Sequence, residues 1–390
     1  MIRPISSALV ALVVFASQAP ALRPLIKYGA QLPGLGNAWL SGLVMVAVVA
    51  CAVAATMMVL RPPPILARLL SLPSLCAALM LGFVVGIAVV YPIADGLKAT
   101  MSGSDQDDAI IVSALNLWRG LNPYAAKHYL GNPTSPGPGW IALHLPFVLA
   151  GVYWLATPAA LAGAALTLRW VSGGWSVPYR FLLIAFSSLA FWEVSAVGSD
   201  FPTFGVVLVI LLCLLDRWRD RLALLSALAL MLGIVATARV VFLFVPILFG
   251  FLVWQRDRRA GAILVAIAAA VAVALHVGFW LWEAALYTPV HVIGLADRVT
   301  PPAIKLAGAV ATGAAGLALW FARDPSLERW FALLWLSLAV PLAFVALGDL
   351  IVRGHGDPAA WEGANYMIIS LPLLAAWMAL RSSRTAICSS

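Results

Sequence analysis

Long runs of apolar residues, separated by short polar stretches, form the dominant pattern of the chain. A helix that crosses the hydrocarbon core of a bilayer needs about 20 apolar residues, although helices inside a bundle can be shorter. The run 140–168 is long and contains Pro158, which predicts a kink or a division of that helix. In all we predict twelve crossings, at residues 5–22, 39–60, 72–95, 140–168, 178–197, 202–215, 221–237, 240–254, 260–282, 305–322, 330–348 and 364–380.

Composition agrees with a membrane protein. Apolar residues make up 63% of the 390 residues, charged residues make up 10%, and the mean hydropathy is +0.99, whereas soluble domains carry about 25% charged residues. The net charge of +8 does not indicate nucleic-acid binding, because the basic residues are scattered between apolar runs. The four cysteines include no CxxC pair. We therefore expect an all-α, polytopic helix bundle, a single transmembrane domain over residues 1–390.

The distribution of charge predicts the orientation of this bundle. With the N-terminus inside, the inner ends and loops carry 15 Lys and Arg and five Asp and Glu, whereas the outer side carries nine basic and eleven acidic residues. Cytoplasmic loops of membrane proteins are enriched in Lys and Arg, so we expect both termini in the cytoplasm. The first segment, with Gln18-Ala-Pro-Ala21 at its end, also resembles a signal peptide. We favour an uncleaved first helix.

The outer side is where a functional site is expected, since its acids have no role in lipid anchoring. It has three substantial loops, at residues 96–139, 283–304 and 349–363, and all five histidines lie on or toward it. The first loop predicts a short helix that begins at Ser104 or Asp105 and ends at Gly120. This helix is mostly apolar, which suits a segment that lies at the membrane interface.

Three interpretations of Asp105, Asp107 and Asp108 in this loop remain open. The carboxylates could simply cap the helix and form a solvated acidic cluster. One of them could be the base that deprotonates a hydroxyl acceptor. The sequence Asp-x-Asp-Asp could also hold a divalent cation, because it supplies hard oxygen ligands at close spacing.

The order of features resembles the GT-C superfamily of membrane glycosyltransferases, in particular the bacterial polyprenyl-phosphate-sugar-dependent mannosyltransferase branch. The most specific part is the acidic pair Asp107-Asp108, followed by a short helix and the pattern Leu-x-x-Gly-x-x-Pro-Tyr from Leu117 to Tyr124. Weaker similarity covers the stretches Gly198 to Thr203, Thr237 to Arg239, and Asn365-Tyr366 with Pro372. The chain departs from the family in having Asp107-Asp108 where many relatives have Asp-Glu, and in two additional helices before the acidic loop.

The resemblance implies a GT-C-like fold with an interfacial helix in the large outer loop. It also implies transfer of mannose, or of another hexose or a pentose, from a polyprenyl-phosphate-linked donor to a hydroxyl on a glycolipid or cell-envelope glycan. The reaction would take place at the periplasmic face of the bacterial inner membrane. On this basis Asp107 and Asp108 rank above Asp105 as the base. A divalent cation could assist but is not obligatory, because a phosphate is already an acceptable leaving group.

Several residues are candidates for binding the substrates. Arg239 is the first candidate for the donor phosphate, because a charge near the hydrocarbon is costly unless it is paired, and Arg353 is the second. Glu193 could pair with Arg239 or line the acceptor site. The other cations considered for the phosphate are Lys127, Arg298 and Lys305, and the other candidates for substrate binding are Tyr124, Asp200, His355 and Tyr366.

A secondary transporter, or a flippase of a lipid-linked substrate, is the alternative function. Twelve helices with a few intramembrane charges would suit either of these proteins. However, the sequence contains no inverted or parallel repeat and no matched pair of Gly- or Pro-broken helices, and its acids lie in outer loops rather than at the midplane. We therefore expect an enzyme.

Overall fold

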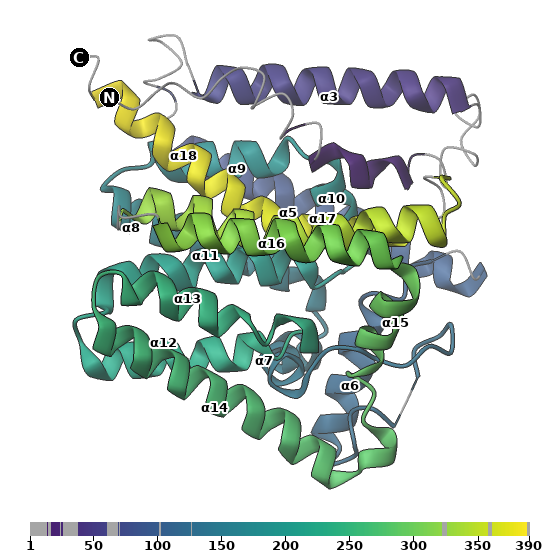
Figure 1. Cartoon of the computed structure of the whole chain (residues 1–390). Coiled ribbons are helices and arrows are strands. Elements are labelled where there is room, and N and C mark those ends of the chain that lie inside the picture. Colours follow the sequence, from purple (N-terminus) through teal and green to yellow (C-terminus); the bar gives the residue numbers. More distant parts are fainter. Residues whose placement is uncertain are drawn as a thin grey trace.

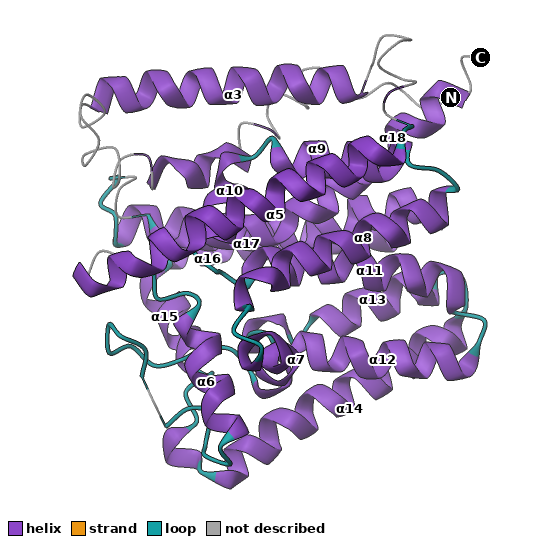
Figure 2. Ribbon diagram, turned by 180° about the vertical axis from the view of Figure 1, so that it is seen from behind, coloured by secondary structure: helices purple, strands orange, loops and turns teal. Residues whose placement is uncertain are grey.

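The computed structural model describes residues 14, 17–23, 25, 38–60, 69, 71–100, 103–125, 127–321, 326–357 and 361–387. Within these ranges the regular structure is helical and contains no strand (Figures 1 and 2). The elements are η1 (Ala19–Ala21), α3 (Ala38–Leu60), α5 (Pro73–Gly96), η2 (Leu97–Thr100), α6 (Asp108–Trp118), α7 (Pro138–Leu149), η3 (Tyr153–Leu155), α8 (Ala156–Ser172), α9 (Ser176–Phe186), α10 (Leu189–Ala196), α11 (Phe201–Trp218), α12 (Leu222–Ala236), η4 (Val240–Phe242), α13 (Val245–Trp254), α14 (Arg258–Trp282), η5 (Ala284–Leu286), α15 (His291–Val299), α16 (Pro302–Phe321), α17 (Leu327–Val352), η7 (Glu362–Ser370) and α18 (Leu371–Ile387).

Five stretches of the described chain are long and apolar enough to cross a membrane, and the number rises to seven if each of two bent helix pairs is one span. The five are Pro73–Thr100, Phe201–Trp218, Arg258–Trp282, Leu327–Val352 and Glu362–Ser382. The all-helical prediction is thus confirmed for the described residues, whereas the count of twelve crossings is not. Most of the predicted first crossing, 5–22, lies outside the described residues.

Two predicted crossings are each divided into two helices. The run 140–168 becomes α7 and η3–α8, and the chain bends by 117° between them. Helix α7 ends at Leu149. Gly151, in the break that follows, has a φ of 69°, a conformation that favours glycine. Pro158, where we predicted the kink, instead lies in the first turn of α8, where a missing N–H costs no hydrogen bond. The run 178–197 is likewise divided into α9 and α10, at 80°.

The short helix predicted in the first outer loop is α6. It ends before Gly120, as predicted, and Gly120 has a φ of 71°. Its N-cap differs from the prediction, however. The cap is Asp107, whose Oδ1 accepts a hydrogen bond from the backbone N–H of Asp108 at 2.9 Å, so Ser104 and Asp105 are left outside the helix.

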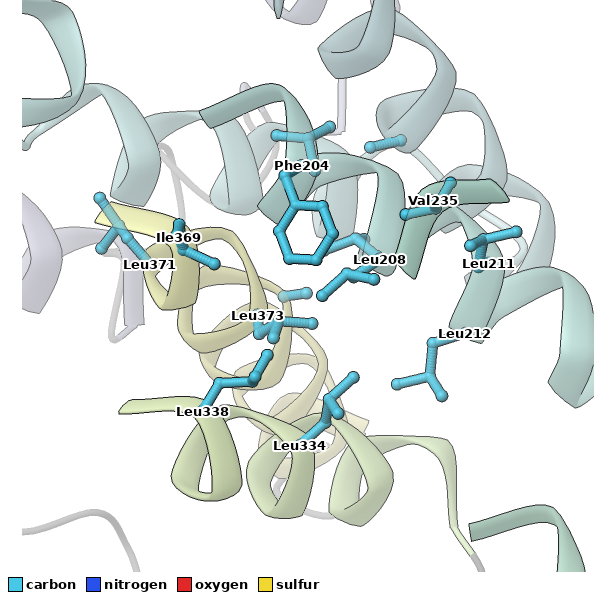
Figure 3. Close-up of a cluster of buried hydrophobic side chains, with 14 of the residues drawn as sticks. Phe204, Leu208, Leu211, Leu212, Val235, Leu334, Leu338, Ile369, Leu371 and Leu373 are labelled. Carbon is cyan, nitrogen blue, oxygen red and sulfur yellow. The ribbon is translucent and has the colours of Figure 1, made fainter. Parts of the chain in front are cut away.

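The core of the bundle is built around α11. Figure 3 shows Phe204, Leu208, Leu211 and Leu212 of this helix packed with Val235 of α12 and with leucines of α17 and α18. Two thirds of the residues in the apolar window of α11 are buried, against 17% for α5 and for α14. Therefore α11 is an inner helix, whereas most residues of α5 and α14 are not fully buried.

The loops gather at the two ends of the bundle. In Figure 1 most long helices run across the picture, and α6 and α15 lie near each other in its lower right part. The turns at residues 216–221 and 255–258 meet Ser326 around a basic hollow at the opposite end of α11 and α17. Arg180, a basic residue that we assigned to the inner side, is buried in α9, where it donates to Ser382 Oγ at 2.6 Å.

Gly205 allows α11 to approach η7 closely, and this approach can be tested. A Cβ atom at this position would lie 2.2 Å from the backbone oxygen of Ile369. We expect Gly205→Ala to lower the free energy of unfolding by about 1–3 kcal/mol, because the backbone must shift to relieve the overlap. Thermal unfolding in detergent measures the loss. Gly82→Ala in α5 is the control, since its Cβ would meet nothing within 4 Å, and equal shifts for both variants would contradict the close packing.

Candidate functional site

A cavity of about 540 Å³ lies at the end of the bundle that we assigned to the outer side. Its walls come from the segments 103–109 and 128–135, from the start of α11, from η4 and the residues beside it, and from α15, α17 and η7. Six of the candidate residues line this cavity: Asp105, Glu193, Asp200, Arg239, Arg353 and Tyr366. The structure thus brings together residues that lie as far as 261 positions apart in the sequence.

The most buried ion pair in the cavity lining is that of Asp200 and Arg239. The two guanidinium nitrogens of Arg239 donate to the two carboxylate oxygens of Asp200, at 2.8 and 2.9 Å. Asp200 also accepts a hydrogen bond from the indole N–H of Trp140 at 2.7 Å. Both side chains are buried, with 2% of Asp200 and 6% of Arg239 exposed. The buried partner of Arg239 is therefore Asp200, rather than the Glu193 that we considered from the sequence.

Local sequence explains how this pair is held. Arg239 lies between α12 and η4 in extended backbone, and Asp200 is the N-cap residue of α11. Thr237 links the region to α7, because its Oγ1 accepts a hydrogen bond from the backbone N–H of Trp140 at 2.9 Å. Gly137 permits this contact, since a Cβ there would lie 2.0 Å from the backbone oxygen of Thr237. Gly137 thus has a role in positioning the pair.

Asp107 and Asp108 do not line the cavity. Both contact the ammonium of Lys98, which lies 2.8 Å from Asp107 Oδ1 and 2.7 Å from Asp108 Oδ1, and Tyr91 donates to Asp107 at 2.7 Å. Burial raises the pKa of Asp107, although the hydrogen bonds from Lys98 and Tyr91 act in the opposite direction. Lys98 therefore occupies the position between the two acids that a divalent cation would take, and this cluster anchors α6 to the end of α5.

Asp105, which we ranked below the other two acids, does line the cavity. Its Oδ2 lies 3.3 Å from Nε2 of His128, and 30% of its side chain is exposed. His128 is buried, lines the same cavity, and has no hydrogen-bond partner for Nδ1 among the described residues. The sequence contained no local signal for this contact, because 23 positions separate the two residues.

A second group of charges also lines the cavity, and we call its more exposed members, Arg353 and Glu362, the rim. Asp349 is buried, and its carboxylate accepts from the backbone N–H of Gly363 at 2.6 Å and contacts Nε of Arg353 at 3.3 Å. Arg353 also pairs with Glu362. Arg23 approaches the same Glu362 carboxylate, at 3.5 Å. Neither Arg23 nor Asp349 nor Glu362 was predicted from the sequence.

The remaining candidates have other positions. Tyr366 packs on Phe201, with ring centroids 4.9 Å apart, and Arg239 lies over the same phenyl ring. Tyr124 is buried outside the cavity, where its hydroxyl donates to the backbone oxygen of Pro136 at 3.2 Å. His355 is exposed in the turn after α17, with a φ of 49°. The other cation candidates, Lys127, Arg298 and Lys305, are also absent from the lining.

The part of the chain that the structure describes contains no group of three or more His, Cys, Asp and Glu side chains placed to hold a metal ion. Comparison of the chain with protein-family models, with curated proteins and with solved structures found no match.

The Asp200–Arg239 pair predicts a strong coupling between two substitutions. Removing one partner leaves the other charge buried, which costs about 3–5 kcal/mol. We expect Asp200→Asn and Arg239→Gln each to lower the thermal stability markedly, and the double variant to lose much less than the two single losses combined. Thermal unfolding of the four proteins in detergent measures the coupling. Strictly additive losses would contradict the pair.

Proposed function

We propose that the protein is a membrane glycosyltransferase of the GT-C type. In this proposal it moves a sugar from a polyprenyl-phosphate-linked donor to a hydroxyl of a glycolipid or cell-envelope glycan, at the periplasmic face of the bacterial inner membrane. The observation that carries the proposal is that one cavity combines a partly exposed carboxylate, a group of guanidinium ions and an apolar wall. Its volume of about 540 Å³ lies within the usual range for small-molecule sites.

The base in this proposal is Asp105. It lines the cavity, whereas Asp107 and Asp108 are both held by Lys98. His128 Nε2 lies 3.3 Å from Asp105 Oδ2, and in this proposal the other carboxylate oxygen, Oδ1, faces the acceptor. Asp105 then takes the proton of the acceptor hydroxyl while that oxygen forms a bond to the anomeric carbon. The bond from this carbon to the phosphate oxygen breaks, and the polyprenyl phosphate leaves with its electron pair.

Arg353 is the better candidate for the donor phosphate than Arg239. The guanidinium of Arg239 already makes two hydrogen bonds to Asp200 inside the protein, so a phosphate would have to compete with a buried bidentate partner. Arg353 is one third exposed at the rim of the cavity. The cavity wall beside it is apolar, with Leu342 and Val345 of α17 facing Val292, Leu295 and Val299 of α15. This wall suits the first isoprene units of the donor.

Glu193, Asn365 and Tyr366 complete the proposed site on the side of α10 and η7. Their carboxylate, amide and phenol groups are able to hydrogen-bond sugar hydroxyls. The proposal does not require a divalent cation, because a phosphate is already an acceptable leaving group. Twelve crossings remain part of the proposal, in which α3, α12, α13, α16 and the first predicted crossing, 5–22, join the seven spans.

Asparagine substitutions distinguish the three acids. We expect Asp105→Asn to reduce sugar transfer by roughly 10²–10⁴-fold, because the variant keeps the shape but removes the proton acceptor. Asp107→Asn is expected to lower thermal stability, with transfer falling only in proportion to the folded protein. Radiolabelled lipid-linked donors in membranes measure the rate. A silent Asp105→Asn, combined with full loss in stable Asp107→Asn or Asp108→Asn, would return the role of base to the acidic pair.

Orientation is tested by cysteine labelling in a cysteine-free background. An impermeant reagent applied from the periplasm should label a cysteine at Asn132, beside the cavity, and should not label one at Asp257 in the basic hollow. The opposite result would place the cavity on the cytoplasmic side.

Uptake into vesicles, assayed beside sugar transfer, separates the alternative transporter or flippase from the enzyme. Uptake or lipid movement without transfer would support that alternative.

A further inference from the structure

Arg23 and Arg353 converge on one carboxylate at the rim of the cavity. Glu362 pairs with Arg353 through Oε2, and its Oε1 lies 3.5 Å from a guanidinium nitrogen of Arg23. All three side chains line the cavity. A phosphate group can bind in the same arrangement, because its oxygens can accept hydrogen bonds from both guanidinium ions.

The segment that carries Arg23 is held in place by buried hydrogen bonds of Gln18. The side chain of Gln18 is fully buried, and its amide donates to the backbone oxygen of Ser187 at 2.9 Å and accepts from the backbone N–H of Leu189 at 3.0 Å. These contacts fasten residues 17–23 to the break between α9 and α10. Arg23 therefore reaches the cavity from a segment that is itself anchored.

The two acids near Arg353 differ in how firmly they are held. Asp349 is 4% exposed in its side chain and is fixed by the backbone N–H of Gly363, whereas the Glu362 side chain is 55% exposed. Exposed ion pairs contribute little to stability. Glu362 can thus leave the guanidinium pair at low cost, while Asp349 continues to hold Arg353 in place.

We propose that Arg23 and Arg353 form the binding site for the phosphate of a prenyl-chain lipid, and that Glu362 occupies this site until the phosphate displaces it. The inference rests on the proposed function, since it assigns the donor phosphate to a particular pair of residues. Cleavage of the donor adds negative charge to the lipid phosphate, which strengthens its contacts with two guanidinium ions. The return of Glu362 then favours release of the product.

A lipid phosphate fits this site better than a soluble one because of the helix that carries Arg353. Leu342, Val345 and Asp349 line the cavity together with Arg353. Their spacings of three and four residues place them along one face of α17. A prenyl chain can therefore lie on the apolar part of this face while its phosphate reaches the arginine pair.

The test is calorimetric titration of the full chain, purified in detergent, with farnesyl phosphate as the probe. We expect Glu362→Gln to tighten binding by about two- to fivefold, because the competing anion is removed. Arg23→Gln and Arg353→Gln should each weaken binding by about tenfold or more. In the Arg353→Gln background, Glu362→Gln should have little further effect. Farnesol and inorganic phosphate should both bind more weakly than farnesyl phosphate.

Asp297→Asn is the matched control. It removes an exposed outer acid that pairs with Lys305 outside the cavity, and it should leave binding unchanged. Unchanged or weaker binding in Glu362→Gln, at normal thermal stability, would overturn the inference, as would equal affinity for farnesol or for inorganic phosphate. Sugar transfer is measured in parallel. If the variants show the expected binding pattern but no donor supports sugar transfer, the proposed enzyme activity is refuted and the phosphate site stands. If sugar transfer occurs but the binding pattern is absent, only the phosphate site is refuted.

Discussion

The buried ion pair between Asp200 and Arg239 is the contact on which the geometry of the cavity depends. It joins the start of α11 to the segment between α12 and η4, and Trp140 adds the start of α7. Taking two charges out of water costs several kcal/mol for each ion, and good geometry with additional hydrogen bonds is needed to offset that cost. The paired guanidinium–carboxylate contact, the indole N–H and the backbone oxygen of Ala238 provide these bonds. Three helices are thereby held in one arrangement at the bottom of the cavity.

Most acids at this end of the bundle are held by a cation of the same chain. Lys98 holds Asp95, Asp107 and Asp108, while Arg239 holds Asp200 and Arg353 holds Asp349. This pairing explains why a concentration of acids on one side does not by itself locate a base. A carboxylate that is buried against a guanidinium or an ammonium maintains structure, and removing its charge should first affect stability. Asp105 differs from these acids, because it contacts His128 rather than a Lys or Arg and is 30% exposed on the cavity wall.

The sequence predicted those features that depend on local pattern. Apolar runs identified the helices, Gly120 identified the end of α6, and six of the residues singled out from the sequence line the cavity. The breaks within 140–168 and 178–197 were harder to place, because hydropathy does not change where the chain turns at Gly151 or at Ser188. The sequence also did not show which charged residues pair with each other. Lys98 and the acids of α6 are close in sequence, but Arg239 could have met Glu193, Asp200 or a ligand, and only the packing of α7, α11 and α12 decides among them.

The contrast between buried and exposed charges also bears on how a site of this kind could work. The pairs at the bottom of the cavity exchange partners only at a cost of several kcal/mol, because a separated charge there has no water to replace its partner. The charges at the rim can exchange partners readily, since water screens them. A substrate that brings its own anion should therefore bind at the rim, where it can replace a carboxylate, and should leave the deep pair intact. On this reasoning the Asp200–Arg239 pair keeps its arrangement when a substrate binds, and any change on binding is confined to the side chains near Glu362.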